Sequence, residues 1–459
     1  MLEKGQNVEI EITDISDRGQ GIGRAGGLTV FVSPFPSEEG WYIPSPGDIL
    51  KVELTKIKKN YAFGIPVSLI SVSFQRIVPF CAHAGECGGC PLAATSYEMQ
   101  KELKEKRVRE TLSRIGKIKE PKVQPMLTMK DPCFYRNKAV FAVKGKKIGF
   151  MGRQSGEIAE INECMLISPT ALAVLKTVRR FLLESRALIE SVTVRTALTG
   201  EVMVAFDSPY DNISESNRLI EMLDDAVTDD FYSLESVMLL HNNRSKILAG
   251  KKSIIDIMKS PHRKDPFKFR LSAESFFQIN QKMTEQLYEK ALEYADLKGT
   301  EAVLDIYCGI GSIGIYLAEK AGYIIGIESS KEAFDDANRN VTVNCITNAV
   351  YISGRAEEVL PGLLNDDPKY DEEIIKKAKN TDVVILDPPR AGCRRELLEA
   401  AVSASPERIV YVSCDPATLA RDVEILTLAG YNFVEATPVD MFPWTGHVET
   451  VVLMSRKDK

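Results

Sequence analysis

The sequence predicts an α/β protein with a C-terminal doubly wound parallel sheet, a small N-terminal β-barrel and a mixed α/β segment between them. Short apolar runs alternate with helical segments from residue 299 onward, as strands and helices do in a doubly wound sheet. Residues 5–71 instead alternate with period two between glycine and proline clusters, which predicts a small antiparallel barrel. The intervening stretch mixes both patterns. We place the three parts at residues 1–72, 73–264 and 265–459.

Length and composition are those of a globular chain. The 459 residues are 44% hydrophobic and 27% charged, and a prior of about 150 residues per domain gives three domains. The net charge of -6 means that any nucleic-acid surface has to be a local basic patch. The first residues lack the apolar core of a signal peptide, and no apolar run is long enough to cross a bilayer. We therefore expect a cytoplasmic protein without membrane contact.

The N-terminal barrel carries one basic, aromatic segment. Residues 56–62 place three lysines beside Tyr61, a combination that suits phosphate contact and base stacking. The alternative is a solvated edge strand whose lysines discourage aggregation.

Cysteines are concentrated after the barrel. Cys81, Cys87 and Cys90 lie within ten residues, and Cys164 is a candidate fourth partner. Nine cysteines without a secretion signal argue for metal binding or thiol chemistry rather than a disulfide framework. A close C-x-x-C pair that ends in Cys-Pro, as Cys90 and Pro91 do, is typical of bacterial iron–sulfur sites. Structural zinc more often uses two paired knuckles, so the spacing favours a cluster but leaves zinc and no metal open.

The middle segment contains a helix and a basic strand pair. Apolar residues recur near a 3.6 period over about residues 96–117 and predict a basic amphipathic helix that packs on the C-terminal domain. Interleaved glutamates make a solvated outer face the simpler interpretation. The strand pair that follows can hold phosphates through Arg136, Lys138 and Arg153.

The C-terminal part begins with a nucleoside-binding pattern. The glycine turn at residues 309–314 follows a strand and opens a helix, and Glu328 ends the next strand. Glycines admit close approach of a cofactor to the backbone, and the acid can accept hydrogen bonds from ribose hydroxyls. This pattern does not distinguish a nicotinamide dinucleotide from S-adenosylmethionine. The strands that we expect here are residues 303–306, 323–328, 350–352, 383–387 and 409–413.

Cys414 lies at a strand-to-helix corner. An apolar strand runs into the polar turn at Cys414, and Pro416 can begin the following helix. Such corners lie in the crevice at the carboxyl ends of parallel strands, where Asp387 is also expected. Hydride transfer needs no thiol there, whereas methyl transfer to an unactivated ring carbon does. The alternative is a small buried cysteine.

Five ordered motifs together resemble the RNA uracil-5 methyltransferases. The N-terminal segment is also similar to a TRAM domain, a barrel of the OB-fold type, so that with the cysteines the resemblance covers nearly the whole chain. It implies a Rossmann-like class I methyltransferase domain, S-adenosylmethionine as cofactor and RNA as substrate. The motifs are residues 275–280 (SFFQIN), 305–309 (DIYCG), 387–392 (DPPRAG), 413–418 (SCDPAT) and 442–449 (FPWTGHVE).

The resemblance implies roles for individual residues. Cys414 would be the nucleophile that adds to carbon 6 of uracil, and Glu449 the base that removes the carbon 5 proton. An antiparallel last strand would bring Glu449 to the same sheet edge as Cys414. Arg355 departs from the acidic or amide residue expected beside the adenine. The cofactor-binding residues implied are Gln278, Tyr307, Gly309, Ser312, Glu328 and Asp387.

The resemblance also implies a 4Fe-4S cluster and an RNA partner. Cys81, Cys87, Cys90 and Cys164 would hold the cluster, which would be structural or RNA-facing because methyl transfer needs no electron. The remaining cysteines, Cys133, Cys308, Cys345 and Cys393, are expected to be packing residues.

The target uridine would be flipped into the crevice. We expect 23S ribosomal RNA as the substrate, with a tRNA T-loop as the nearest alternative and no protein partner implied. An inactive RNA-binding protein and a dehydrogenase are the other hypotheses for the function. The first leaves the presence of both Cys414 and Glu449 unexplained, and the second leaves the Ser-Cys-Asp-Pro turn at residues 413–416 unexplained.

Overall fold

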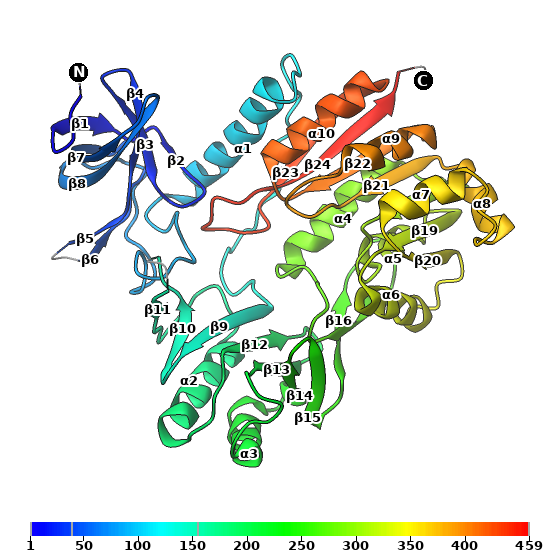
Figure 1. The fold of residues 1–459 in the computed structure, drawn as a ribbon, viewed down its shortest axis with the longest axis horizontal. Coiled ribbons are helices and arrows are strands. Elements are labelled where there is room, and N and C mark those ends of the chain that lie inside the picture. Colours follow the sequence, from blue (N-terminus) through cyan, green and yellow to red (C-terminus); the bar gives the residue numbers. More distant parts are fainter. Residues whose placement is uncertain (1, 38–39, 154–155, 458–459) are drawn as a thin grey trace.

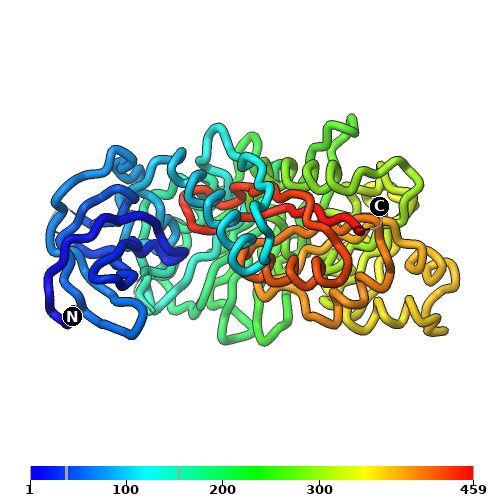
Figure 2. Tube along the Cα trace, turned by 90° about the horizontal axis from the view of Figure 1, so that it is seen from above, coloured from blue at the N-terminus to red at the C-terminus, as the bar shows by residue number. Residues whose placement is uncertain are grey.

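The computed structural model describes residues 2–37, 40–153 and 156–457, which form an elongated molecule with three large β-sheets in chain order (Figures 1 and 2). The N-terminal sheet lies at one end of the long axis and the C-terminal α/β sheet at the other. None of the helices in the described part combines the length and apolar composition that a membrane crossing requires.

The N-terminal sheet wraps around a small apolar core. Alternate residues of β7 point inward, so that Leu50 and Val52 are buried while Lys51 is exposed. The strand order is β1-β7-β8-β4-β3-β2, and β4 and β8 are the one parallel pair in this order. The prediction of an antiparallel barrel is wrong for this pair. Because β7 runs antiparallel to β8, the chain reverses between them, and β8 then runs in the same direction as β4. The bounds are β1 (Asn7–Glu11), β2 (Asp14–Ile15), β3 (Gly21–Ala25), β4 (Leu28–Val32), β5 (Phe35–Ser37), β6 (Gly40–Tyr42), β7 (Ile49–Ile57) and β8 (Tyr61–Ser71).

The middle sheet has α2 and α3 packed together on one side (Figure 1). Its order is β11-β10-β9-β12-β13-β14-β15, so that β15 is an edge strand. Ser168 caps α2 by accepting a hydrogen bond from the Ala171 amide at 3.1 Å. The bounds are β9 (Lys138–Lys144), β10 (Lys147–Met151), β11 (Ile158–Ala159), α2 (Pro169–Glu184), β12 (Ser191–Thr196), β13 (Glu201–Asp207), α3 (Ser216–Val227), β14 (Ser233–His241) and β15 (Arg244–Gly250).

The C-terminal sheet is the doubly wound sheet that the alternation predicted. Its order is β20-β19-β18-β21-β22-β24-β23, in which the first five strands are parallel and β24 runs antiparallel to both of its neighbours. The strand order reverses between β18 and β21, which is the position where such sheets bind ligands. Its strands are β18 (Ala302–Ile306), β19 (Tyr323–Glu328), β20 (Ala349–Ser353), β21 (Val383–Leu386), β22 (Arg408–Ser413), β23 (Tyr431–Val439) and β24 (Glu449–Arg456).

A hairpin and a helix connect the middle and C-terminal sheets. The hairpin, β16 and β17, shares a core with α4 and with residues of both sheets, such as Met238 and Val410. The division at residues 72 and 264 therefore stays a prediction. The bounds are β16 (Ser253–Met258), β17 (Phe267–Ser272), α4 (Gln281–Ala295), α5 (Ser312–Leu317), α6 (Lys331–Val343), α7 (Ala356–Leu364), α8 (Glu372–Lys379), α9 (Arg395–Ser403) and α10 (Pro416–Leu428).

Helix α1 (Tyr97–Arg114) joins the barrel to the C-terminal sheet and lies beside α10 (Figures 1 and 2). Val108 and Leu112 are buried in the same core as Leu419 and Val423 of α10. The apolar side of α1 therefore packs against α10 and into the core of the C-terminal sheet.

Candidate active site

A cavity of about 750 Å³ opens at the carboxyl ends of the parallel strands. All eight residues that the motifs assigned to catalysis or to the cofactor line it: Gln278, Tyr307, Gly309, Ser312, Glu328, Asp387, Cys414 and Glu449. Further lining residues that the assignment missed include Asn243, Phe276, Tyr288, Arg390, Phe442 and His447. Arg390 and His447 stand inside two of the quoted motifs, so their polar side chains were the available signal. Phe276 and Phe442 also stand inside quoted motifs, but their apolar side chains gave no such signal, and Asn243 and Tyr288 lie outside every motif and required the fold.

The glycine turn after β18 leaves open space for a ligand. Gly309 has a φ of 55°, and a Cβ added to it would meet nothing within 4 Å. Its amide donates a hydrogen bond of 2.9 Å to Glu328 Oε2, while Oε1 accepts one of 2.6 Å from the Ser330 amide. These two bonds fix the carboxylate at the end of β19. The arrangement fits a nucleoside ligand whose ribose meets an acid beside an unobstructed backbone.

Two hydroxyl groups of the cavity are already oriented by neighbours. Ser312 Oγ lies 2.7 Å from the hydroxyl of buried Tyr288. The Tyr307 hydroxyl donates to Glu357 at 3.4 Å, and Tyr307 itself has a left-handed φ of 64°. Such a conformation is costly for a residue with a side chain, so the turn holds the tyrosine in a fixed direction.

Arg355 lies at the N-terminus of α7 with its guanidinium toward acidic side chains. Its Nε is 3.9 Å from Glu357 and 3.8 Å from Glu358. It does not appear among the described residues that line the cavity. Arg355 therefore does not provide the contact with adenine that the family resemblance implies for this position.

Cys414 occupies the corner between β22 and α10. Asp415 caps the helix by accepting hydrogen bonds from the amides of Ala417 and Thr418 at 2.8 and 3.0 Å. The half-buried thiol lines the same cavity as Glu449. Burial and the negative charges of Glu449 and Asp387 raise the pKa of Cys414 to about 11, while the positive charge of Arg390 acts in the opposite direction. The thiol is therefore protonated at neutral pH until a positive charge or a base activates it.

Glu449 begins β24 and pairs with Val439 of β23, which places its buried carboxyl in the cavity. Burial, with the charge of Asp387, raises its pKa to about 8, and Arg390 again opposes the shift. Desolvation raises the pKa of Asp387 to about 7. Carboxyl groups that titrate near neutral pH are suited to proton transfer.

We expect the ligand-free protein to lose stability as the pH rises from about 4.5 to about 8. The pKa of Glu449 goes from 4.5 to about 8 on folding, so in this window the folded state holds a proton that the unfolded state has released, and folding weakens as pH rises. Melting temperatures of wild type and Glu449→Gln across this range test it. The melting temperature of Glu449→Gln should fall less with rising pH than that of wild type. Equal falls in both proteins would contradict the raised pKa of Glu449.

The loop between β23 and β24 carries His447 and leads into Glu449, and α1 holds it in place. Lys104 Nζ lies 2.6 Å from Asp440 Oδ1 and 3.1 Å from the Phe442 carbonyl oxygen, and the Tyr97 hydroxyl donates to Asp440 Oδ2 at 2.8 Å. The ion pair is almost completely buried. The loop is thereby fixed by a helix more than three hundred residues earlier in the chain.

Further contacts join this loop to the barrel and to the cysteine segment. Arg107 donates to the Gly446 carbonyl at 2.7 Å and also pairs with Asp17 of the barrel. Trp444 has a φ of 69° and packs against Phe80, which precedes Cys81. The position of Glu449 thus depends on packing from all three parts of the chain.

Lys104→Met is expected to lower the free energy of unfolding by about 3 kcal/mol or more, because Asp440 would keep a buried charge without its cation. Urea unfolding followed by circular dichroism measures the change. The double variant Lys104→Met/Asp440→Asn should recover part of the loss, since neither charge is then left buried alone. A free energy of unfolding of Lys104→Met within about 1 kcal/mol of the wild-type value would contradict the prediction.

The four clustered cysteines line one pocket of about 540 Å³ together with Arg136 and Arg153. All four have free thiols. Arg136 Nε and Arg153 Nη2 are buried and have no hydrogen-bond partner among the described residues. At the present side-chain positions, no group of three or more His, Cys, Asp or Glu in the described ranges forms a metal-holding set. The pocket therefore gathers the thiols without arranging them as ligands.

The same pocket changes the interpretation of the basic strand pair. Arg136 and Arg153 were expected to hold phosphates, but the structure directs both into the cysteine pocket. Arg153 donates to the carbonyls of Gly85 and Arg18 at 3.1 and 2.8 Å. Burial lowers the pKa of Lys138, the third of these residues, to about 8. These cations are therefore poorly placed for an open phosphate surface.

The remaining cysteines are only partly the packing residues that we expected. Cys308 and Cys393 are buried, and Cys133 is half-buried. Cys345 is exposed, so the packing prediction is wrong for it. It lies just after α6 with a left-handed φ of 56°, where the chain turns at the surface.

The barrel presents the aromatic and basic side chains that its sequence suggested. Phe31, Tyr61 and Phe63 form a ring cluster with centroid separations of 5.5 to 6.1 Å. Lys58 and Lys59 are exposed beside them, at the turn between β7 and β8. This surface can stack a base and contact phosphates.

Comparison with known proteins gives consistent matches along the whole chain. A family model described as tRNA (uracil-5-)-methyltransferase matches residues 160–457, and a TRAM domain model matches residues 2–67. An uncharacterized RNA methyltransferase of Caldanaerobacter subterraneus is 39% identical over 98% of both chains, and one of Clostridium acetobutylicum is 35% identical over 100% of this chain and 99% of the relative.

One solved structure also matches over nearly its full length. The crystal structure of Pyrococcus abyssi tRNA (uracil-54, C5)-methyltransferase in complex with S-adenosyl-L-homocysteine has a TM-score of 0.71 and 27% identity. The match covers 97% of this chain and 100% of that one.

Proposed function

This chain belongs to the tRNA (uracil-5-)-methyltransferase family of S-adenosylmethionine-dependent RNA methyltransferases, and from this premise we propose that it methylates carbon 5 of a specific uridine in 23S ribosomal RNA. The observation that carries the proposal is that Cys414 and Glu449 line one cavity together with the six residues assigned to the cofactor. That cavity holds a nucleophile, a titrating acid and an open glycine turn, which are the groups that this chemistry needs.

In the proposed reaction, the Cys414 thiolate adds to carbon 6 of uracil, and the electron pair of the carbon 5–carbon 6 double bond moves onto the ring as an enolate. S-adenosylmethionine would supply the methyl group that carbon 5 takes up and would leave as S-adenosylhomocysteine. The Glu449 carboxylate then removes the proton from carbon 5, and the thiolate leaves as the double bond re-forms. Cys414 is thereby regenerated, and Glu449 returns its proton to water.

Arg390 serves both groups in this scheme. Its charge lowers the pKa of Cys414 and of Glu449, and its side chain lies 3.4 Å from His447 Nε2 at the cavity wall. A cation at this position favours the thiolate that adds and the carboxylate that takes the proton. The sulfonium charge of bound cofactor would act on both groups in the same direction.

Gln278, Tyr307, Gly309, Ser312, Glu328 and Asp387 are the proposed cofactor-binding residues. The turn at Gly309 fits a nucleoside because no atom lies within 4 Å of an added Cβ. Glu328 keeps lone pairs for ribose hydroxyls beyond the two amide bonds that orient it. Asp387 can also face the uracil, since it lines the same cavity as Cys414.

The RNA substrate is the finer part of the proposal. The association of a TRAM barrel with four clustered cysteines favours ribosomal RNA within this family. A tRNA T-loop is the second candidate, because the matched family model and the Pyrococcus structure are both described for tRNA. Both substrates require the uridine to leave its stack and enter the cavity.

Incubation with labelled S-adenosylmethionine and, separately, unmodified 23S ribosomal RNA and tRNA transcripts tests the function. We expect label in 5-methyluridine from the ribosomal transcript after nucleoside analysis. Label in tRNA alone would select the second candidate. Cofactor binding without labelling of either transcript would contradict the catalytic proposal and favour an inactive RNA-binding protein.

We also propose that Cys81, Cys87, Cys90 and Cys164 hold a 4Fe-4S cluster with a structural role. Support comes from four free thiols around one pocket and from the unpartnered buried N–H groups of Arg136 and Arg153 beside them. Sulfur ligands with negative charge would accept hydrogen bonds from these groups. A cluster would brace the segment whose Phe80 packs on Trp444.

Protein purified without oxygen is expected to contain iron and acid-labile sulfide in equal amounts, with the broad visible absorption of a cluster. Cys164→Ser should lose most of the iron, because one of the four proposed ligands is removed. Cys345→Ser is the matched control, since that thiol is exposed and is not among the residues that line the pocket. Zinc in place of iron, or equal iron in both variants, would overturn the assignment.

A further inference from the structure

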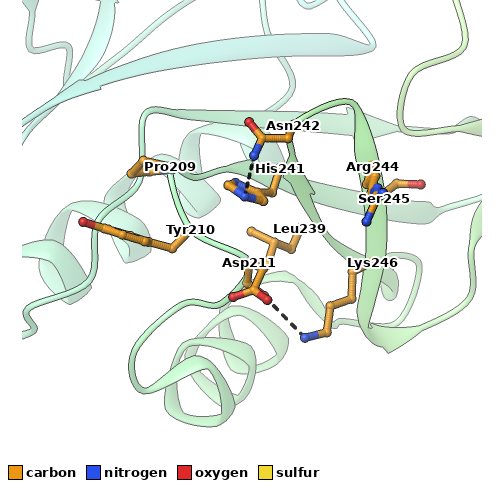
Figure 3. A pocket seen from close by; sticks show the side chains of 9 residues that line it. All are labelled: Pro209, Tyr210, Asp211, Leu239, His241, Asn242, Arg244, Ser245 and Lys246. Carbon is orange, nitrogen blue, oxygen red and sulfur yellow. Dashed lines mark hydrogen bonds between the residues drawn. The ribbon is translucent and has the colours of Figure 1, made fainter.

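A second cavity, of about 710 Å³, lies at the tip of the β14–β15 hairpin (Figure 3). The loop after β13 forms one side with Tyr210, and the hairpin forms the other with Arg244 and Lys246. None of the motifs led to this cavity. Its lining residues are Pro209, Tyr210, Asp211, Leu239, His241, Asn242, Arg244, Ser245 and Lys246.

The hairpin tip is held in one geometry. Asn242 and Asn243 have φ values of 48° and 57°, as a tight two-residue hairpin turn requires. His241 Nδ1 lies 3.0 Å from the Ser208 carbonyl oxygen, so Nδ1 donates a hydrogen bond, and Nε2 accepts one from the side-chain Nδ2 of Asn242 at 2.8 Å. The imidazole thus ties the hairpin to the opposite loop and fixes the width of the cavity.

The cavity is basic and carries an unpacked aromatic ring. Arg244 and Lys246 are exposed, and neither lies within ion-pair distance of a carboxylate in the described part of the chain. Lys246 Nζ donates to the Asp211 backbone carbonyl at 3.4 Å. Tyr210 is 56% exposed. The carboxylate of Asp211 also lines the cavity and can accept hydrogen bonds from base amino groups or ribose hydroxyls.

The position of the hairpin connects this cavity to the catalytic one. Asn243, next to Arg244, also lines the catalytic cavity, together with Phe276 and Cys414. Phe276 is 69% exposed at that cavity. An RNA strand that delivers a base to Cys414 therefore has the hairpin tip at its side, with the second cavity directly beyond it.

We propose that the cavity at the β14–β15 hairpin binds a nucleotide that flanks the target uridine in the RNA. The base stacks on Tyr210, and the phosphates beside it contact Arg244 and Lys246. Its occupant is thus a single-stranded or splayed-out segment of the substrate RNA, which sets how tightly and in which register the RNA is held. The inference rests on the proposed function, because it takes the catalysed substrate to be RNA.

The test compares Arg244→Glu/Lys246→Glu and Tyr210→Ala with wild type. A matched control is Lys176→Glu/Arg180→Glu, which reverses two exposed charges on α2 of the same middle segment. Binding of unmodified 23S ribosomal RNA and tRNA transcripts is measured over a range of potassium chloride concentrations. Cofactor affinity and circular dichroism report whether each variant keeps its fold.

We expect the charge reversal to raise the Kd for the substrate transcript about tenfold or more and to reduce the slope of log K against log salt by about one to two. Tyr210→Ala should raise the Kd with the slope unchanged, because stacking releases no counterions. The kcat at saturating RNA and the cofactor affinity should stay at wild-type values, and the α2 control should bind as wild type does.

Equal RNA affinity of wild type, Arg244→Glu/Lys246→Glu and Tyr210→Ala would overturn the inference, as would equal losses in the α2 control. Failure of the proposed function would give a different result, because wild type would then bind the transcripts without methylating them. The binding comparison would still decide whether the cavity takes RNA. A loss of kcat with unchanged Kd would assign the hairpin to the catalytic cavity instead and would also overturn the inference.

Discussion

Replacing Cys414 by alanine is expected to abolish methylation, with a loss of about 10⁴-fold or more in kcat, while binding of S-adenosylmethionine persists. Without the Cys414 thiol the ring loses the nucleophile of the proposed reaction, and carbon 5 of an unactivated uracil is a poor nucleophile. Cys308 also lines the cavity, but it is buried, and burial raises its pKa well above the ordinary value. The side chain is half-buried at a corner whose helix cap is made by Asp415, so its truncation leaves the cap intact.

Methyl transfer to the transcript that wild type modifies is the measurement, with calorimetric titration of the cofactor as the check on the fold. Cys345→Ala is the control, because this thiol is exposed and outside the cavity. It should be as active as wild type. Methylation by Cys414→Ala at a rate near that of wild type would disprove the covalent mechanism.

Replacing Glu449 by glutamine is expected to trap the RNA on the protein. The thiol can still add to the ring and carbon 5 can still accept the methyl group, but the carbon 5 proton then has no base to remove it, so elimination stops. Turnover should fall by about 10² to 10⁴-fold. Glutamine keeps the size of the glutamate, and burial of a neutral amide is compatible with a site that already raises the pKa of this carboxyl to about 8.

The adduct is detected as a protein band of reduced mobility on a denaturing gel, with label from both the RNA and the methyl group. The double variant Cys414→Ala/Glu449→Gln should give no such band, since the covalent bond requires the thiol. Rapid release of methylated RNA by Glu449→Gln would show that another group takes the proton. The band should also be absent when the target uridine is replaced in the transcript.

Local patterns were sufficient for the parts of this protein that depend on neighbours in the chain. The alternation of strands and helices after residue 299 predicted the doubly wound sheet, and the glycine turn predicted open space at Gly309, where a Cβ would meet nothing within 4 Å. Residues at the ends of parallel strands meet at one edge of a sheet. For that reason, Asp387 and Cys414 could be placed in one crevice from their sequence context, and the structure has both in one cavity.

Contacts between distant segments were decided only by the tertiary structure. The sequence predicted that Arg136 and Arg153 bind phosphates. In the structure both pack against the cysteine segment and line its pocket. The pairing of Lys104 with Asp440 joins residues 336 positions apart, and the hairpin at Asn243 reaches the catalytic cavity from another sheet. The physical reason is that a periodic pattern determines which side of an element is buried, whereas the partner that buries it depends on how the sheets pack together.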